Sequence, residues 1–151
     1  MKKNDLAVDF TLLDQDGNPR TLSTMLLEGP VILFFYPAAM SPGCTKESCH
    51  FRDLDAEFAA LGAQLVGISM DSPERQSQFA KKHGLNYPLL ADVDGTVAEH
   101  YGVKRSLNFL KVKRATFVIG HDRRILDVIS SEVSMNAHAD RALAVLRVAH
   151  A

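Results

Sequence analysis

A long unbroken apolar run, VILFFY at residues 31–36, lies between two prolines. Such a run is typical of a central strand that is covered on both faces. Residues 64–69 have a similar character and predict a second buried strand. Two further apolar segments, residues 115–119 and 125–129, flank a Gly-His-Asp-Arg turn, so we expect them to pair antiparallel.

Helical periodicity is clearest between Phe51 and Leu61, where apolar residues recur at steps of three and four and Gly62 then ends the pattern. Ser72 followed by Pro73 predicts the start of another helix, because serine is a good N-cap and proline suits the first helical position. The remaining expected elements are a hairpin over residues 9–13 and 20–22 and helices over residues 73–83, 96–101 and 137–149.

This order of elements predicts an α/β fold of the thioredoxin type. We expect a central mixed β-sheet flanked by helices, with the N-terminal β-hairpin beside it. No linker, repeat or low-complexity tract divides the sequence, so we treat residues 1–151 as a single domain. In open α/β sheets the chemistry lies at the carboxyl ends of strands, and the first strand-to-helix junction here contains Cys44.

Composition narrows the class of protein. A chain of 151 residues that is 46% hydrophobic is expected to be globular, and two cysteines cannot form a disulfide framework. With 17 basic and 18 acidic residues, nucleic acid and anionic membranes are disfavoured as main partners. No apolar run is long enough for a secretory signal or a membrane span, so we expect a cytoplasmic protein. Cysteines there are more often catalytic or metal-binding than structural.

The residues before Cys44 favour a reactive thiol. If Ser41 is the N-cap of a helix, Pro42, Gly43 and Cys44 are its first three residues. The free backbone N–H groups and the positive end of the helix dipole then stabilise a thiolate. Gly43 also leaves room for a small substrate near the backbone. The alternative, that Cys44 is only a small buried apolar residue, fits this setting less well.

Cys49 follows five residues later, and its role is open. In an intact helix the two Cα atoms are roughly 8.6 Å apart, whereas a disulfide rarely tolerates more than about 7 Å. A Cys44–Cys49 disulfide therefore requires the first turn to unwind. The spacing alone equally allows Cys49 to be a packing residue.

A metal site is disfavoured. Cys44, Cys49 and His50 do not match the spacing of zinc sites. We expect the histidines to lie at the surface rather than to act as ligands or bases; they are His50, His83, His100, His121, His138 and His150.

The sequence PAAMSPGC at residues 37–44 resembles the active-site signature of the peroxiredoxins, and Cys49 at five residues further on is similar to the peroxiredoxin Q subfamily, also called bacterioferritin comigratory protein. Blocks at residues 67–72, 87–92 and 114–119 extend the resemblance over most of the chain. The resemblance implies a peroxidatic Cys44, a resolving Cys49, a Pro37 that shields the thiolate and an Arg114 that polarises the peroxide. Substrate contacts are implied for Ser41, Gly43, Cys44 and Arg114.

From the residues alone, Arg114 would be a solvated member of the basic run 111–114. The resemblance instead implies a thiol peroxidase that reduces hydrogen peroxide and organic hydroperoxides without metal, haem or flavin. Cys44 becomes a sulfenic acid, Cys49 converts it into a disulfide, and thioredoxin or a similar dithiol restores both thiols. A monomer is expected, although a homodimer is possible. A redox sensor and a thiol–disulfide oxidoreductase are the alternatives, the latter usually having its cysteines closer together.

Two departures from the family pattern matter. Ser41 stands where threonine is commoner, and the apolar residues Ala38, Ala39 and Met40 replace more polar ones. An apolar rim of this kind favours organic or lipid hydroperoxides as substrates.

Overall fold

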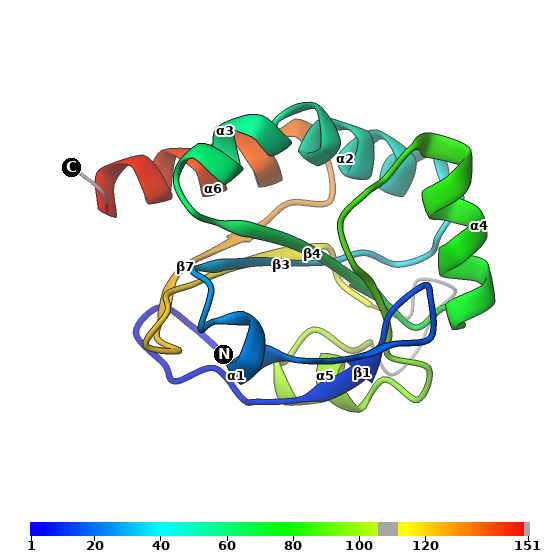
Figure 1. Cartoon of the computed structure of the whole chain (residues 1–151), viewed down its shortest axis with the longest axis horizontal. Helices are drawn as coiled ribbons and strands as arrows, with labels where there is room; N and C mark the ends of the chain where they lie inside the picture. The colour runs from blue at the N-terminus through cyan, green and yellow to red at the C-terminus, as the bar shows by residue number, and fades with distance from the viewer. Residues whose placement is uncertain (106–111, 150–151) are drawn as a thin grey trace.

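A computed structural model of the chain describes residues 1–105 and 112–149. Its centre is a five-stranded mixed sheet in the order β5-β4-β3-β6-β7 (Figure 1). The strands are β3 (Val31–Phe35), β4 (Gln64–Ser69), β5 (Leu89–Ala91), β6 (Ala115–Ile119) and β7 (Ile125–Ser130). Strands β3, β4 and β5 are parallel, whereas β6 is antiparallel to both β3 and β7. The expected central strand and the antiparallel pair are confirmed; β5 was not anticipated.

The unbroken apolar run of β3 has a simple cause. Successive residues of a strand point to opposite faces, and both faces of this sheet are buried. Ile32 and Phe34 belong to one core cluster, whereas Val31, Leu33 and Phe35 belong to the other. A strand in the middle of two cores has no solvent-facing side for polar residues.

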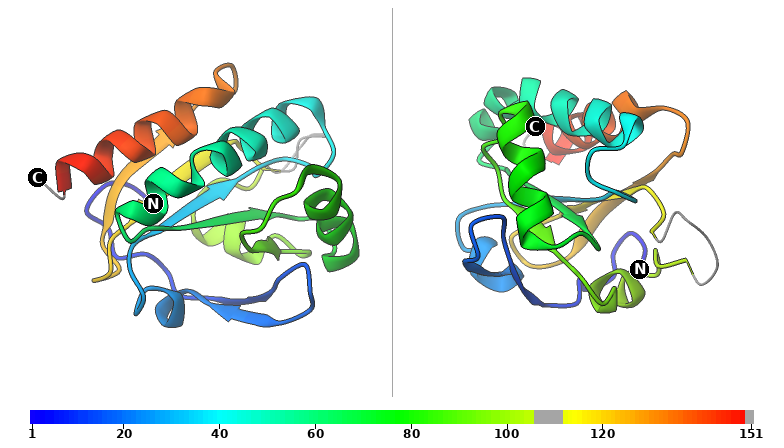
Figure 2. Two further views of the ribbon diagram at one scale, coloured as in Figure 1. Left: turned by 45° about the horizontal axis from the view of Figure 1, so that its top comes forward. Right: turned by 90° about the vertical axis from the view of Figure 1, so that its right-hand side faces the viewer.

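Helices cover both faces of the sheet (Figures 1 and 2). On one face lie α2 (Pro42–Asp53), α3 (Asp55–Ala60), α4 (Pro73–His83) and α6 (Met135–Ala149). The periodic stripe up to Leu61 therefore spans two helices rather than one, because Leu54 leaves the helical conformation at φ −99° and ψ 6°. Ser72 caps α4 as expected, its Oγ accepting a hydrogen bond from the Arg75 backbone N–H.

The opposite face carries the short helix α5 (Thr96–His100), the N-terminal hairpin of β1 (Thr11–Leu13) and β2 (Pro19–Thr21), and α1 (Leu22–Met25). The hairpin is confirmed, whereas α1 was missed because four residues are too few for a periodic pattern. Among residues 1–105 and 112–149, no helix combines the length and apolar character needed to cross a membrane.

The sheet register brings the candidate residues together at one end of the strands β3 and β6. Phe35 at the end of β3 is paired with Ala115 at the start of β6. Because these two strands are antiparallel, the residue before β6, Arg114, lies beside the segment that leaves β3. That segment leads through Pro37 and Ser41 into α2, so the arginine and the first turn of α2 meet.

Candidate active site

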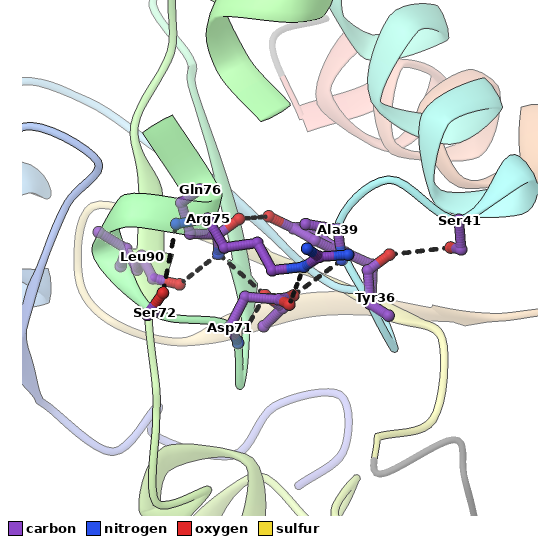
Figure 3. Close-up of polar contacts among 10 residues, drawn as sticks. Tyr36, Ala39, Ser41, Asp71, Ser72, Arg75, Gln76 and Leu90 are labelled. Atoms are coloured by element: carbon purple, nitrogen blue, oxygen red, sulfur yellow. Dashed lines mark hydrogen bonds and ion pairs between the residues drawn. The ribbon is translucent and has the colours of Figure 1, made fainter. Parts of the chain in front are cut away.

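The loop between β3 and α2 is fixed by hydrogen bonds from β4 and the segment after it (Figure 3). The Ala39 backbone N–H donates to Asp71 Oδ2 over 2.8 Å, and the Ser69 hydroxyl donates to the same oxygen over 2.6 Å. Arg75 Nε lies 3.3 Å from Asp71 Oδ1. One carboxylate thus ties the loop to the end of β4, and Pro37 at the start of the loop is buried.

Ser41 occupies the N-cap position of α2, but its side chain does not cap the helix. Its Oγ donates to the Ala38 carbonyl oxygen over 2.8 Å, and it makes no hydrogen bond to a helical N–H. The expected N-cap position of Ser41 is therefore confirmed, but without a side-chain capping hydrogen bond. The loop itself offers an acceptor, and Met40 before Ser41 has a left-handed backbone with φ 71°, which closes the chain into a tight turn.

Cys44 is the third residue of α2, as expected, and its side chain is 0% exposed. Arg114 Nη2 lies 3.3 Å from its Sγ. The approach to Gly43 is filled by the same guanidinium: a Cβ at Gly43 would lie 3.2 Å from Arg114 Nη2 and 3.4 Å from Met135 Sδ. Gly43 therefore gives room to a protein side chain, in addition to any room for substrate.

Arg114 is not a solvated residue of a basic run, since only 6% of it is exposed. Besides Cys44 it contacts Glu47, whose Oε1 lies 2.9 Å from Arg114 Nη1. Burial alone lowers the pKa of Arg114, but the negative charges of Glu47 and Cys44 raise it above its ordinary value. The guanidinium therefore stays charged beside the Cys44 sulfur.

Glu47 and His138 complete the buried cluster, and the sequence interpretation assigned a role to neither. Both are 0% exposed, and His138 Nδ1 of α6 lies 3.4 Å from Glu47 Oε2. Burial raises the pKa of Glu47 to about 8, against the opposing charge of Arg114. Burial lowers the pKa of His138. The expectation that all histidines lie at the surface is wrong for His138; His150 and Lys111 lie outside the described residues.

Cys49 is separated from this cluster. It is half-buried on the unbroken helix α2, and both cysteines are free thiols. The Tyr87 hydroxyl donates to the backbone carbonyl of the preceding residue, Ser48, over 2.7 Å. The helix is therefore intact and held at the point where Cys49 lies, so the two sulfurs cannot join without a local opening of α2.

Together, the fold and this buried cysteine–arginine pair define a thiol-based oxidoreductase of the thioredoxin-like class. The model of the AhpC/TSA family matches residues 4–128. The chain belongs to the AhpC/TSA family, which confirms the peroxiredoxin resemblance given by the signature at residues 37–44.

Individual relatives agree with this family. The peroxiredoxin Bcp of Escherichia coli is 38% identical over 143 residues, covering 91% of each chain. The crystal structure of the peroxidoxin BcpB from Mycobacterium tuberculosis is 60% identical, covers 98% of this chain and 97% of its own, and has a TM-score of 0.94. A structure of the Xanthomonas campestris bacterioferritin comigratory protein, studied for alkyl peroxide reduction, is 28% identical, with coverages of 94% and 92% and a TM-score of 0.86. These relatives confirm the peroxiredoxin Q subfamily and a thiol-dependent peroxidase activity.

Proposed function

We propose that Cys44 is the peroxidatic residue of this peroxidase. The observation that carries the proposal is the position of its sulfur: fully buried, in the first turn of α2, and 3.3 Å from the Arg114 guanidinium. A thiolate is the nucleophile in thiol chemistry. A fixed positive charge and free helix N–H groups both favour that form.

In the first step the Cys44 thiolate attacks the terminal oxygen of the hydroperoxide. An S–O bond forms as the O–O bond breaks, Cys44 becomes a sulfenic acid, and the departing alkoxide or hydroxide takes a proton from water. Arg114 and the backbone N–H groups of Gly43 and Cys44 stabilise the charge that builds on the oxygens. Ser41 contributes its hydroxyl once that group turns from Ala38 to the substrate, and Pro37 shields the thiolate from solvent.

In the second step the Cys49 thiolate attacks the sulfenic sulfur of Cys44. The S–S bond forms as the S–O bond breaks, and the hydroxide that leaves takes a proton from solvent to become water; the step requires the start of α2 to open. Thioredoxin or a similar dithiol then reduces the disulfide by exchange and becomes oxidised itself. Because a new round needs both thiols, this step makes the reaction catalytic.

We propose hydrogen peroxide and organic hydroperoxides as substrates. The loop beside Cys44 carries Ala38, Ala39 and Met40, of which Ala38 and Met40 are half-buried and therefore partly accessible. An apolar rim favours the alkyl part of a hydroperoxide. Alkyl peroxide reduction is reported for the related Xanthomonas campestris protein. Rate constants that rise with the apolar size of the peroxide support this preference, and constants that do not rise contradict it.

The enzyme is further proposed to act in the cytoplasm, as a single domain over residues 1–151 and as a monomer. In a reducing compartment, dithiol reductants keep its two cysteines available as thiols.

The test follows peroxide consumption with a thioredoxin recycling system for the wild type, Cys44→Ser and Cys49→Ser. We expect Cys44→Ser to be inactive, since it lacks the nucleophile. Cys49→Ser is the matched cysteine control and is expected to react once and then stall unless a small thiol recycles it. Sustained turnover by Cys44→Ser would overturn the proposal.

A further inference from the structure

The carboxyl group of Glu47 bridges two buried side chains from different elements. Its Oε1 receives the Arg114 guanidinium at 2.9 Å, and its Oε2 faces His138 Nδ1 at 3.4 Å. Oε2 is buried and has no hydrogen-bond partner, an arrangement that is costly for an ionised carboxylate. A proton between Oε2 and Nδ1 removes that cost.

The other contacts of His138 fix which nitrogen faces Glu47. Its Nε2 lies 2.8 Å from the Ser131 carbonyl oxygen, which can only accept, so Nε2 carries a hydrogen. Nδ1 is therefore the atom that can take or release a proton. The Thr116 hydroxyl, 2.8 Å from Nδ1, can donate or accept and is compatible with both states.

The balance of charges in the cluster also indicates one proton held by Glu47 and His138. A Cys44 thiolate, a Glu47 carboxylate and a single Arg114 guanidinium leave one unbalanced negative charge in a buried cluster. One proton on Glu47 or His138 balances it. Arg114 then interacts with one anion, the thiolate, rather than being shared between two.

We propose that His138 is a positioning residue of the peroxidase reaction, which shares one proton with Glu47 and so keeps the charge of Arg114 for Cys44. This inference rests on the proposed role of Cys44. His138 acts on the sulfur only through Glu47 and Arg114, as it contacts neither substrate nor Cys44.

The surroundings of the pair support this role. Burial raises the pKa of Glu47 to about 8, and the Glu132 charge adds to that shift. Burial lowers the pKa of His138, and the Arg114 and Arg141 charges act in the same direction. The pair therefore holds its proton at neutral pH and loses it above about pH 8. The charged and titratable groups around it are Cys44, Tyr87, Arg114, Glu132 and Arg141.

The experiment measures the rate constant of Cys44 oxidation from pH 6 to 9.5, in full-length protein carrying Cys49→Ser so that only the first step is followed. Rapid quenching with a thiol-alkylating reagent and mass spectrometry report the remaining Cys44 thiol. Four proteins are compared: this background alone, and with His138→Gln, Glu47→Gln or His50→Gln. Glutamine at position 138 keeps a donor for the Ser131 carbonyl but has no acceptor at the Nδ1 position.

We expect the rate constant of the background protein to fall above about pH 8, where the pair loses its proton. His138→Gln is expected to move this fall lower by about one pH unit, which slows the reaction about twofold at pH 7 because about half of the pair has then lost its proton. In Glu47→Gln, whose side chain is neutral at every pH, the rate constant is expected not to decrease above about pH 8. His50→Gln is the matched control: it removes the other imidazole contact between α2 and α6, His50–Asp140 at 2.7 Å, and leaves the profile unchanged.

A His138→Gln profile that superimposes on the background would overturn the inference. So would equal slowing by His138→Gln and His50→Gln at every pH, which marks a merely structural link. If His138→Gln does not fold, Glu47→Gln still decides, because a fall that persists in this variant contradicts a proton held by the pair. A Cys44 that is not oxidised in the background protein would instead refute the proposed function.

Discussion

The two halves of α2 are held in different ways. Residues 42–47 carry the buried polar cluster, in which one arginine contacts both Cys44 and Glu47. Residues 48–53 are anchored on several sides. The ring of Phe51 stacks on Phe34 at 4.2 Å between centroids, and Arg52 Nη1 donates to the His83 carbonyl oxygen over 2.6 Å.

This difference matters for a reaction that must open the helix. One contact of the first half depends on the charge of the Cys44 sulfur, because a thiolate attracts the Arg114 guanidinium more strongly than a neutral sulfenic acid does. The hold on the second half is aromatic stacking and hydrogen bonding, which are unaffected by oxidation. We therefore expect oxidation of Cys44 to weaken the first half of α2 more than the second half, in which Cys49 lies.

The largest expected effect concerns the anchored half. Phe51→Ala removes a fully buried ring that stacks on β3, and we expect the free energy of unfolding to fall by about 3–5 kcal/mol. Urea unfolding measures this loss. Val148→Ala, at a side chain that is 77% exposed, serves as the control and should stay within about 0.5 kcal/mol of the wild type. A loss below about 1 kcal/mol for Phe51→Ala would mean that the stack does not anchor the helix.

The next largest effect concerns the first half of α2, residues 42–47, which contains Cys44 and Glu47. Arg114→Ala leaves the thiolate without its guanidinium, and we expect the rate constant of Cys44 oxidation to fall at least about 100-fold. Arg52→Ala removes an arginine from the anchored half and is expected to change the same constant less than about threefold. Equal losses in the two variants would contradict the distinction between the halves.

A smaller effect is the pH dependence of stability, to which the buried carboxyl of the first half contributes. The pKa of Glu47 is raised from its ordinary 4.5 to about 8 by burial, so the folded protein binds a proton that the unfolded chain releases. The contribution of this proton to the free energy of unfolding is fully present below pH 4.5 and is lost as the pH rises through about 8. His138, whose pKa is lowered, has the opposite effect, but only below its ordinary 6.5.

Between pH 6.5 and 8 the free energy of unfolding should therefore decrease because of Glu47, by at most about 1.4 kcal/mol per pH unit. Urea unfolding of the wild type and Glu47→Gln across this range checks the expectation. The variant should lack this decrease. An identical dependence of the free energy of unfolding on pH in the two proteins would exclude Glu47 as the source of the decrease.

Much of the fold and part of the site follow from the sequence. The apolar run at residues 31–36 was sufficient to predict the central strand, because a strand between two cores needs apolar side chains on both faces. Likewise, the cap, proline and glycine before Cys44 were sufficient to predict a thiol in the first turn of a helix. Both predictions rest on residues that are adjacent in sequence, so they do not depend on which distant segments pack together.

The contacts that depend on tertiary structure could not be predicted in this way. Nothing near Arg114 in the sequence shows that it is buried, because its partners are 67 and 70 residues away. His138 lies between two alanines on a helix whose buried face is set by packing on α2 and β6. For Glu47 a signal existed: three residues after Cys44, it shares the cysteine's face of the helix.

Hydrogen exchange of the α2 amides, before and after stoichiometric oxidation to the disulfide, tests the central claim most directly. We predict that residues 45–48 lose protection by at least about 100-fold on oxidation while residues 52–54 keep theirs. Mass spectrometry of the same sample establishes that the Cys44–Cys49 bond has formed. Unchanged protection of residues 45–48 with the disulfide present, or equal loss along the whole helix, would contradict the account.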